Sequence, residues 1–291
     1  MTTILVTGAS GQLGQELQVL ATQYTDWKFV FCNRQDLDIT NHSAIDAIFE
    51  QYQFDYCINC AAYTAVDKAE SDLELATAIN TTAVGYLASA CQSYDTQLIH
   101  ISTDYVYHNS QNHPFQETDT TSPKGVYAQT KLDGEVLAAQ NCPQTMIIRT
   151  SWVYSSFGHN FVKTMLRLGK DRDKLTVIFD QIGSPTYAAD LADAILQCIK
   201  QNFAKTIDQT ELKGVYHYSN EGVCSWYDFA LAIFELEDIS CHVAPIETKD
   251  YPTPAKRPHF SLLNKNKIKT AFNLNIPHWR TSLKDCLTKL H

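Results

Sequence analysis

A short apolar run that leads straight into closely spaced glycines constrains the fold of this chain most. Residues 3–7 (TILVT) have the composition of a strand buried on both faces, and the loop GASGQLG follows at residues 8–14. The next six residues have the apolar spacing of a helix. A glycine loop at the amino terminus of a helix lets a pyrophosphate approach unpaired N–H groups and the positive end of the helix dipole. The pattern therefore predicts nucleotide binding, although glycines in such a turn can also be purely structural.

Strand and helix patterns alternate through the first half of the chain. Strands are predicted at residues 27–32, 55–61 and 98–102, and helices at residues 43–52 and 76–94. Alternation at this spacing predicts a parallel sheet with helices on both faces. We therefore expect an α/β, Rossmann-type doubly wound domain over residues 1–150.

Residues 151–291 have a less regular pattern, with prolines in several loops. A strand is predicted at residues 215–219, and Ser225 is expected to cap a helix that runs through residues 229–234. We expect a smaller α/β lobe in this range, which binds the substrate and whose segments can interleave with the first domain.

The composition narrows the partners and compartments to consider. With 23 Lys and Arg against 32 Asp and Glu, the net charge is −9, which argues against a duplex-binding surface, so no nucleic-acid partner is expected. Nine cysteines in 291 residues are too few for a disulfide scaffold and favour a reducing compartment. The first residues lack a basic n-region, and no run approaches about 18 apolar residues, so we expect a cytoplasmic protein without membrane contact.

A metal site is not expected. Cys57 and Cys60 form a C-x-x-C pattern, but residues three apart on a strand point to opposite faces and cannot share a metal ion. Both side chains are expected to be buried thiols. Glu16 and Asp190 are acidic, but they do not assemble into a convincing ligand set.

The end of the second predicted strand bears on the type of cofactor. Dinucleotide-binding folds contact the adenosine ribose here, with an acid for a free 2′-hydroxyl or an arginine for a 2′-phosphate. Arg34 lies at this point, and no acid directly follows the strand. The arginine favours NADPH, with NADH as the alternative.

The strongest chemical signal is the pair Tyr127 and Lys131. Residues four apart share one face of a helix, so an ammonium group is expected beside a phenol. The ammonium group favours the phenolate and lowers the phenol pKa from about 10 toward the range that a general acid needs. Thr103 and Asp104 follow the predicted strand at residues 98–102, where open parallel sheets place their substrates.

Longer segments carry a resemblance to a known family. The chain resembles the extended short-chain dehydrogenase/reductase superfamily in the segments TGASGQLG, NCAAYTAVDKAE, ISTDYVY, YAQTKLDGE, RTSWVYSSFGHNFVKTML, DQIGSPTYAADLA and PAKRPHFSLL. Within that superfamily it is most similar to the dTDP-4-dehydrorhamnose reductase family, over nearly the whole chain. The glycine loop and Tyr-x-x-x-Lys occur across the superfamily, whereas AAYTAVDKAE, TDYVY and WVY are much more specific to the family.

The resemblance implies an oxidoreductase that uses NAD(P)H to reduce the C4 keto group of dTDP-4-dehydro-6-deoxy-L-mannose to dTDP-L-rhamnose. It implies a catalytic triad of Thr103, Tyr127 and Lys131. Tyr127 would protonate the alkoxide that forms at C4, and Thr103 would hydrogen-bond the same oxygen. Lys131 would hold the nicotinamide ribose and lower the tyrosine pKa.

The resemblance and the residue patterns together give the remaining expected contacts. The expected cofactor contacts, besides Tyr127 and Lys131, are Gly8, Gly11, Gln12, Leu13, Gly14, Arg34, Asp38, Ile39, Ala62, Tyr63 and Thr64. The expected substrate contacts are Thr103, Asp104, Trp152, Asn160, Gln181 and Arg257. On the residue pattern alone, Leu13 and Trp152 can equally be packing residues. Arg257 is a cation in a Pro-rich loop and is therefore a candidate for binding the substrate diphosphate.

Two alternative functions remain open at this point. A nucleotide-sugar epimerase or dehydratase of the same superfamily would retain its cofactor through the catalytic cycle. A non-catalytic regulatory subunit of this fold would have no need of a tuned phenol. A homodimer is compatible with the resemblance, because some family members dimerise.

Overall fold

The computed structural model describes residues 2–207 and 212–291 and is built around a six-stranded sheet. Every neighbouring pair of its strands is parallel, and the strand order is β10-β5-β4-β3-β1-β2. The strands are β1 (Thr2–Thr7), β2 (Trp27–Cys32), β3 (Tyr56–Asn59), β4 (Gln97–Thr103), β5 (Met146–Thr150) and β10 (Gly214–Tyr218). This doubly wound order confirms the predicted Rossmann-type α/β fold class.

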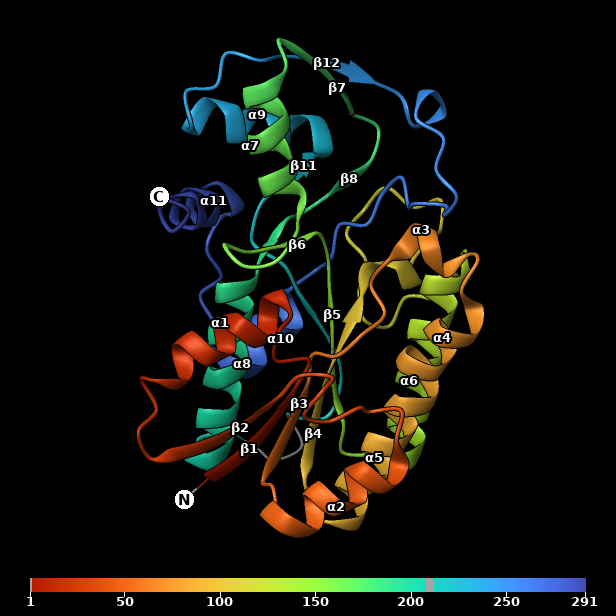
Figure 1. Ribbon diagram of the computed structural model, residues 1–291, viewed down its shortest axis with the longest axis vertical. Helices are drawn as coiled ribbons and strands as arrows, with labels where there is room; N and C mark the ends of the chain where they lie inside the picture. Colours follow the sequence, from red (N-terminus) through yellow and green to blue (C-terminus); the bar gives the residue numbers. More distant parts are fainter. Residues whose placement is uncertain (1, 208–211) are drawn as a thin grey trace.

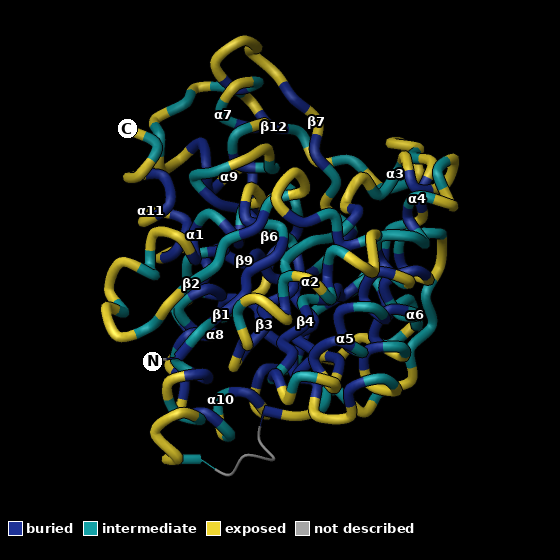
Figure 2. The backbone as a smooth tube through the Cα atoms, turned by 60° about the horizontal axis from the view of Figure 1, so that its bottom comes forward, coloured by how far each residue is buried: buried dark blue, intermediate teal, exposed yellow. Residues whose placement is uncertain are grey.

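Helices cover both faces of the sheet (Figure 1). One face carries α1 (Gln12–Ala21), α8 (Ala188–Phe203) and α10 (Asn266–Phe272), and the other carries α2 (His42–Tyr52), α5 (Ala83–Ser93) and α6 (Val126–Asn141). Successive side chains of a strand point to opposite faces. In β1, Ile4 and Val6 accordingly join the apolar cluster under α1 and α8, and Leu5 joins the cluster under α2 and α5. The sheet is therefore the buried middle layer, as the dark strands β1, β3 and β4 show in Figure 2.

The helix predicted over residues 76–94 is present, but it begins earlier and is interrupted by a π-helical turn. The segment begins as α4 (Leu73–Thr77), widens into a π-helical turn at Ala78–Thr82 and continues as α5. The turn carries Asn80, whose buried side chain accepts a hydrogen bond from the Tyr63 amide at 2.8 Å and donates to the Tyr63 carbonyl at 3.1 Å. A π-turn of this kind is common near functional sites. The contact of Asn80 with Tyr63 joins segments 17 residues apart, and the helical spacing of the sequence does not contain it.

The smaller lobe lies above the sheet in Figure 1 and has an apolar core of its own. Its elements are α7 (Phe161–Asp171), β7 (Lys174–Ile178), α9 (Trp226–Leu236), β12 (His242–Ile246) and α11 (Trp279–Thr288), with the short strands β6 (Val153–Tyr154), β8 (Ile182–Gly183), β9 (Thr186–Tyr187) and β11 (Cys224–Ser225). Ser225 caps α9 in a capping box with Asp228, which confirms the predicted cap. Two 3₁₀ turns, at Asp104–Val106 and Thr248–Asp250, and α3 (Val66–Ala69) complete the elements that bear on the site.

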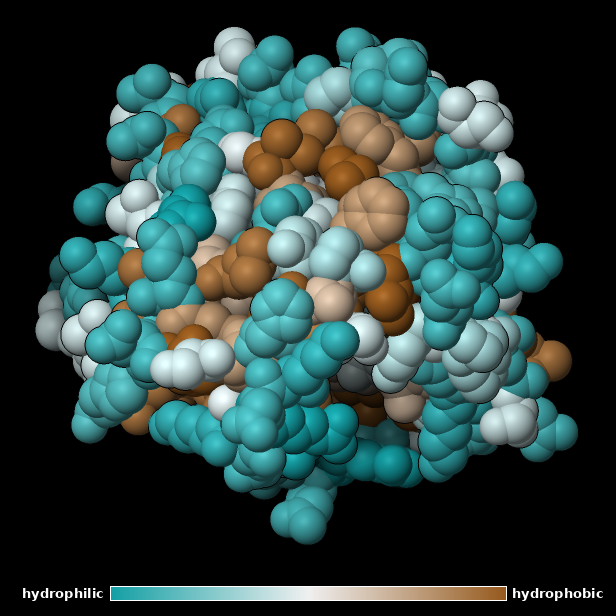
Figure 3. Space-filling view, turned by 90° about the horizontal axis from the view of Figure 1, so that it is seen from above, coloured by the Kyte–Doolittle hydropathy of each residue, from teal (hydrophilic) through white to brown (hydrophobic). Residues whose placement is uncertain are grey.

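Segments of the second half also contribute to the first. The strand β10 lies at one edge of the main sheet, and α8 packs on α1, although both come from the range 151–291. The prediction that segments interleave describes this arrangement, and a boundary at residue 150 stays a prediction. None of the helices in the described part of the chain combines the length and apolarity that a membrane-spanning segment requires. From above the lobe, hydrophobic side chains gather in the middle of a mostly hydrophilic face (Figure 3).

Candidate active site

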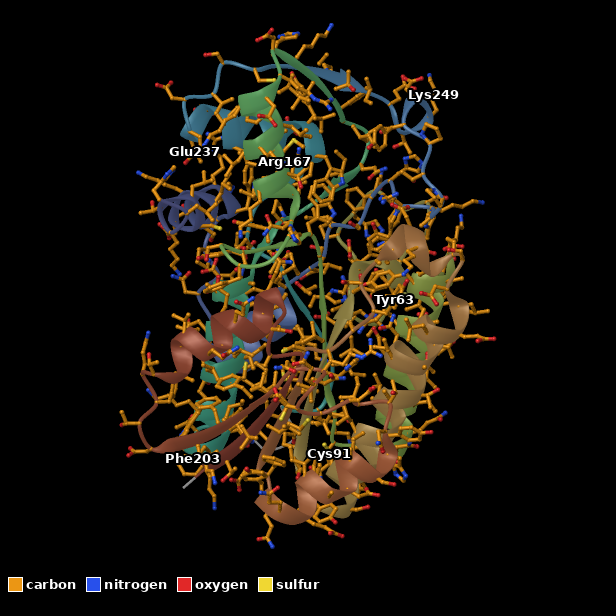
Figure 4. The ribbon with its side chains drawn as sticks, in the orientation of Figure 1. Tyr63, Cys91, Arg167, Phe203, Glu237 and Lys249 are labelled. Atoms are coloured by element: carbon orange, nitrogen blue, oxygen red, sulfur yellow. The ribbon has the colours of Figure 1, made fainter. Side chains whose placement is uncertain are left out.

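A deep cleft lies at the carboxyl ends of the parallel strands. Its volume is about 870 Å³, and its walls include the loops that follow β1, β3 and β4. The strand β1 has β2 on one side and β3 on the other, so the chain reverses its winding direction between β1 and β3. Open α/β sheets bind their ligands in the crevice at such a switch point. Figure 4 shows Tyr63 at the level where sheet and lobe meet, far from Cys91 and Phe203 at the lower end of the sheet.

Most of the predicted site residues line this one cleft. They are Gly8, Gly11, Gln12, Leu13, Gly14, Arg34, Asp38, Ile39, Ala62, Tyr63, Thr64, Thr103, Asp104, Tyr127, Lys131 and Trp152. Leu13 is also part of the apolar cluster under α1, so it both packs and lines the cleft. Asn160, Gln181 and Arg257 are not among the lining residues.

The glycine loop has the geometry of a phosphate cradle. Gly8 has a φ of +67°, and a Cβ atom at this position would lie 2.6 Å from the Ala61 nitrogen. At Gly14, a Cβ atom would lie 2.5 Å from the Gly8 carbonyl oxygen, so a side chain there would push α1 away from the loop. Gly11 begins α1 without a side-chain cap. The first N–H groups of α1 are thus left for an anion, which fits the pyrophosphate of a dinucleotide.

Arg34 is an exposed cation in the lining of the cleft. The Arg34 side chain is 72% exposed, and its Nε atom lies 3.9 Å from Asp38 Oδ2. Hydrogen bonds from the Thr40 hydroxyl and amide lower the pKa of Asp38. Arg34 is therefore held only weakly, and its guanidinium can reach a phosphate at the adenosine end of a dinucleotide.

The phenol of Tyr127 is in place but is not acidified. Tyr127 lies in the first turn of α6, where the Val126 amide donates to Glu70 at 2.8 Å. Burial raises the pKa of Tyr127 to about 12, although the hydrogen bond with the Thr103 hydroxyl acts in the opposite direction. Burial, Thr103 and Asp104 set this shift, and a lowering of the Tyr127 pKa by Lys131 stays a prediction. Burial outweighs any attraction to the ammonium group.

Lys131 is fully buried and turned toward the sheet. Its Nζ atom donates to the Ile101 carbonyl at 2.7 Å and lies 3.5 Å from Nε2 of His100. Burial lowers the pKa of Lys131 to about 8, while the Glu135 carboxylate and the Cys60 thiol oppose this shift. Burial thus moves the pKa values of the two groups apart, to about 8 for Lys131 and about 12 for Tyr127, and both groups hold protons near neutrality.

Asp104 is the most perturbed carboxylic acid of the cleft. Only 2% of the residue is exposed, and burial raises its pKa to about 7. Its Oδ1 atom accepts a hydrogen bond from the Thr103 hydroxyl at 3.2 Å. Its Oδ2 atom has no hydrogen-bond partner among the described residues. A buried oxygen without a partner is costly, so this atom is suited to a polar ligand group in the cleft.

Trp152 enters the cleft from the lobe in a strained conformation. Its φ is +48°, a value that bulky residues rarely adopt and that costs about 1–3 kcal/mol. The indole stacks on Trp226, with ring centroids 3.7 Å apart. Strain of this kind persists where the surroundings enforce it, often at ligand sites.

The amides of Asn160 and Gln181 have partners within the protein. Asn160 caps α7 by accepting from the Lys163 amide, and its Nδ2 atom donates to Oε1 of Gln12 at 2.9 Å. Gln181 is buried and donates to the Thr248 hydroxyl at 3.1 Å. Asn160 therefore reaches the cleft only through Gln12.

Arg257 makes a bidentate ion pair outside the cleft lining. Its Nη2 atom lies 2.6 Å from Oδ2 of Asp67, and its Nη1 atom lies 3.2 Å from Oδ1. The Ala255 amide also donates to Asp67 at 3.2 Å. The Pro-rich loop is thereby joined to α3 at the edge of the cleft.

Comparison with known proteins decides the family. The family model described as the RmlD substrate binding domain matches residues 1–291. The dTDP-4-dehydrorhamnose reductase of Aggregatibacter actinomycetemcomitans is 40% identical, over 98% of both chains. The enzyme of that name from Salmonella typhimurium is 39% identical, over 99% of this chain and 97% of its own.

The chain belongs to the dTDP-4-dehydrorhamnose reductase family. A crystal structure of the Bacillus anthracis dTDP-4-dehydrorhamnose reductase in complex with NADP has a TM-score of 0.93 and 36% identity, and covers 99% of this chain and 100% of that one. A UDP-glucose 4-epimerase from Thermus thermophilus has a TM-score of 0.81 at 18% identity over 99% of both chains, which shows a shared fold only. The family resemblance and the assignment to the oxidoreductases are confirmed.

Within this family site, several neighbours were not predicted from the sequence. Glu135 lies one helical turn after Lys131, and the four-residue spacing could have revealed it. His100 precedes Ser102 by two residues on β4, so both point to the same face of the sheet. Asp67 and Trp226 act through partners far away in the sequence, and no local pattern marks them. Among the described residues, no group of three or more His, Cys, Asp or Glu side chains could hold a metal ion.

Proposed function

We propose that this chain catalyses the NADPH-dependent reduction of the C4 keto group of dTDP-4-dehydro-6-deoxy-L-mannose to dTDP-L-rhamnose. One observation carries the proposal. In a member of the dTDP-4-dehydrorhamnose reductase family, a single cleft brings the glycine cradle together with Thr103, Tyr127 and Lys131. The cradle would bind a dinucleotide, and the three side chains would transfer a proton beside it.

The cofactor site follows the cleft from the glycine loop to the sheet. The loop at residues 8–14 and the amino terminus of α1 would hold the pyrophosphate, and Arg34 would hold a 2′-phosphate. Asp38 and Ile39 would flank the adenine, and the loop at residues 62–64 would contact the ribose and nicotinamide half. When bound, NADPH supplies the hydride that reduces C4.

Tyr127 would donate the proton that the C4 oxygen needs. With a pKa of about 12, the phenol is protonated at neutral pH before the reaction, as a proton donor must be. Thr103 hydrogen-bonds the phenol, and its hydroxyl would turn its one proton from Asp104 to the developing oxyanion. Lys131 would hold ribose hydroxyls with its protonated amine, and its charge would stabilise the phenolate that remains after the transfer.

The sugar would lie between β4 and the lobe. Asp104 would accept hydrogen bonds from sugar hydroxyls through its unpartnered Oδ2 atom, and Trp152 would lie against the ring. Arg257 would bind the diphosphate only after exchange from Asp67, and Asn160 would support the site by fixing Gln12. A direct substrate contact for Gln181 stays a prediction, as do a homodimer and a cytoplasmic location.

The test is stoichiometric. The purified protein is incubated with NADPH and dTDP-4-keto-L-rhamnose, the loss of NADPH absorbance is followed, and the sugar product is identified. One NADPH oxidised for each dTDP-L-rhamnose formed supports the reductase. A sugar isomer without net NADPH oxidation would indicate an epimerase, and binding without turnover would indicate a regulatory subunit.

A further inference from the structure

The Trp152 indole is supported from behind by a second tryptophan. The ring planes of Trp152 and Trp226 are 10° apart and their centroids are separated by 3.7 Å, which is close parallel stacking. Trp152 lines the cleft, whereas Trp226 is not among the lining residues of the described chain. A cofactor or sugar in the cleft would thus meet one face of this pair only.

The fold places Trp226 through two short strands. The antiparallel pair β8 and β11 sets Gly183 opposite Cys224, and Trp226 is the first residue of α9 directly after β11. The Ser225 cap fixes where α9 begins. Gly183 lies against Trp152. A Cβ atom at this position would lie 2.9 Å from Cε2 of Trp152, so only glycine leaves room for the indole.

A column of aromatic rings continues behind Trp226 into the lobe. Phe161 of α7 lies 4.7 Å from Trp226, and Phe229 of α9 lies 5.6 Å from Phe161, both measured between ring centroids. Phe229 is fully buried in the core of the lobe. The aromatic column (Trp152, Trp226, Phe161 and Phe229) therefore connects the core of the lobe to the cleft.

We propose that Trp226 is a positioning residue for the sugar: it holds the strained Trp152 indole flat toward the cleft, where the indole can pack on the C–H face of a deoxysugar. The proposal rests on the proposed function, because that reaction supplies the sugar. A ring that is ordered before binding avoids the entropy cost of ordering it with each substrate. Loss of Trp226 should therefore weaken sugar binding and leave the cofactor site unchanged.

The experiment compares two tryptophan variants. In Trp226→Leu, the KM for dTDP-4-keto-L-rhamnose is expected to rise about three- to tenfold, the scale of one aromatic pair, with kcat and the Kd of NADPH unchanged. The exciton couplet that two stacked indoles give in the far-ultraviolet circular dichroism spectrum should disappear. The matched control is Trp27→Leu, which removes a tryptophan that begins β2 and stacks on Tyr24, away from the lobe. It should keep both the KM and the couplet.

A double-mutant cycle separates positioning from a general structural role. If Trp226 acts through Trp152, then Trp226→Leu should not raise the KM further in a Trp152→Leu background. Additive increases in KM, or an unchanged KM in Trp226→Leu after the couplet is lost, would overturn the proposal.

If Trp226→Leu does not fold, Trp226→Phe decides: a smaller rise in KM supports the proposal and an unchanged KM overturns it. A wild-type protein that does not oxidise NADPH with this sugar overturns both proposals, whereas an active wild type with these negative results overturns this one alone.

Discussion

Two buried polar clusters lie along successive turns of α6, and they differ in how completely their groups are paired. The first is the reactive cluster, made of Thr103, Asp104, Tyr127 and Lys131, which opens to the cleft. The second is the paired cluster, made of Ser102, Tyr107, Glu135, Arg149 and His217, which lies deeper between α6, β4, β5 and β10. Apart from Tyr127, which is half-buried, the residues of both clusters are almost entirely removed from water.

The paired cluster satisfies its own charges. Arg149 donates to Glu135 through Nε at 2.9 Å and through Nη2 at 2.6 Å, and Ser102 donates to the same carboxylate at 2.5 Å. The Tyr107 hydroxyl lies between Nη1 of Arg149, at 2.5 Å, and Nε2 of His217, at 2.9 Å. Burial and the nearby Arg149 lower the pKa of His217 to about 3, so this ring stays neutral.

The reactive cluster leaves one carboxylate oxygen without a partner, and the proton affinities of its groups are shifted. Oδ2 of Asp104 has no partner among the described residues, and burial raises the pKa of Asp104 to about 7 while it lowers that of Lys131 to about 8. Similar residue types thus serve different purposes in the two clusters. Complete pairing fixes a conformation, whereas incomplete pairing beside a cleft leaves groups available to a ligand and to proton transfer.

The largest expected effect comes from removing one hydroxyl from the reactive cluster. Tyr127→Phe should lower kcat about 10²–10⁴-fold, the range typical of general acid catalysis, because it removes the hydroxyl that is proposed to protonate the C4 oxygen. Its free energy of unfolding and its NADPH affinity should stay close to those of the wild type. The matched control is Tyr107→Phe, the same chemical change in the paired cluster, which should cost about 1–3 kcal/mol of stability and leave turnover per folded molecule intact. Equal turnover for Tyr127→Phe and wild type would end the distinction between the clusters.

The next effect is on stability. Arg149→Met leaves the Glu135 carboxylate buried without its ion partner, which should lower the free energy of unfolding in urea by about 3–5 kcal/mol. The double variant Arg149→Met/Glu135→Leu should recover part of this loss, because no unpaired charge remains. If Arg149→Met were as stable as the wild type, the Arg149–Glu135 ion pair would not contribute to the free energy of unfolding.

The pH dependence of the free energy of unfolding also distinguishes the clusters, through the titration of Asp104. Because the folded-state pKa of Asp104 is raised to about 7, the folded state binds the extra proton between about pH 4 and pH 7. Its contribution to stability therefore falls as the pH rises through this window, by up to about 1.4 kcal/mol per pH unit, and is constant above it. Asp104→Asn removes the slope, so the stability of this variant relative to wild type should increase from pH 4 to 7. A parallel pH dependence of the two proteins would contradict the raised pKa.

The smallest expected effect concerns a charge that belongs to neither cluster. Arg34 is exposed, so Arg34→Ala should raise the KM for NADPH about tenfold, the scale of one charge-assisted hydrogen bond, without changing the KM for NADH. Arg172→Ala, an exposed arginine beyond the end of α7, is the matched control and should change neither value. An equal change in the KM for NADPH and for NADH would show that Arg34 does not act through the 2′-phosphate.

The cofactor side of the cleft could be predicted from the sequence because its residues follow strands. The loops after β1, β3 and β4 lie next to one another in any parallel sheet of this order, so Gly8, Tyr63 and Thr103 meet without further information. The spacing of Tyr127 and Lys131 was enough to place both on one face of α6. Their pKa values were not predictable, because they depend on burial, which the spacing does not contain.

The lobe side depends on contacts between distant residues. Arg257 was expected to bind the substrate diphosphate. Its side chain instead pairs with Asp67, which lies 190 residues earlier in the chain. Asn160 was expected to contact the substrate, but it caps α7 and its side chain is directed to Gln12. The support of Trp152 by Trp226 arises from the pairing of two-residue strands, which have no sequence signature. Loops that meet only in the folded chain leave no periodic pattern from which such pairs could be found.

The central claim, that the reactive cluster protonates the substrate while NADPH reduces C4, is tested most directly by an isotope label. The protein is incubated with the keto sugar and NADPH that carries deuterium at the transferable position of the nicotinamide, and the product is examined by nuclear magnetic resonance. The account predicts one deuterium at C4 of the deoxysugar for each NADPH oxidised. A product without deuterium at C4, or an isomerised sugar with the NADPH intact, would contradict it.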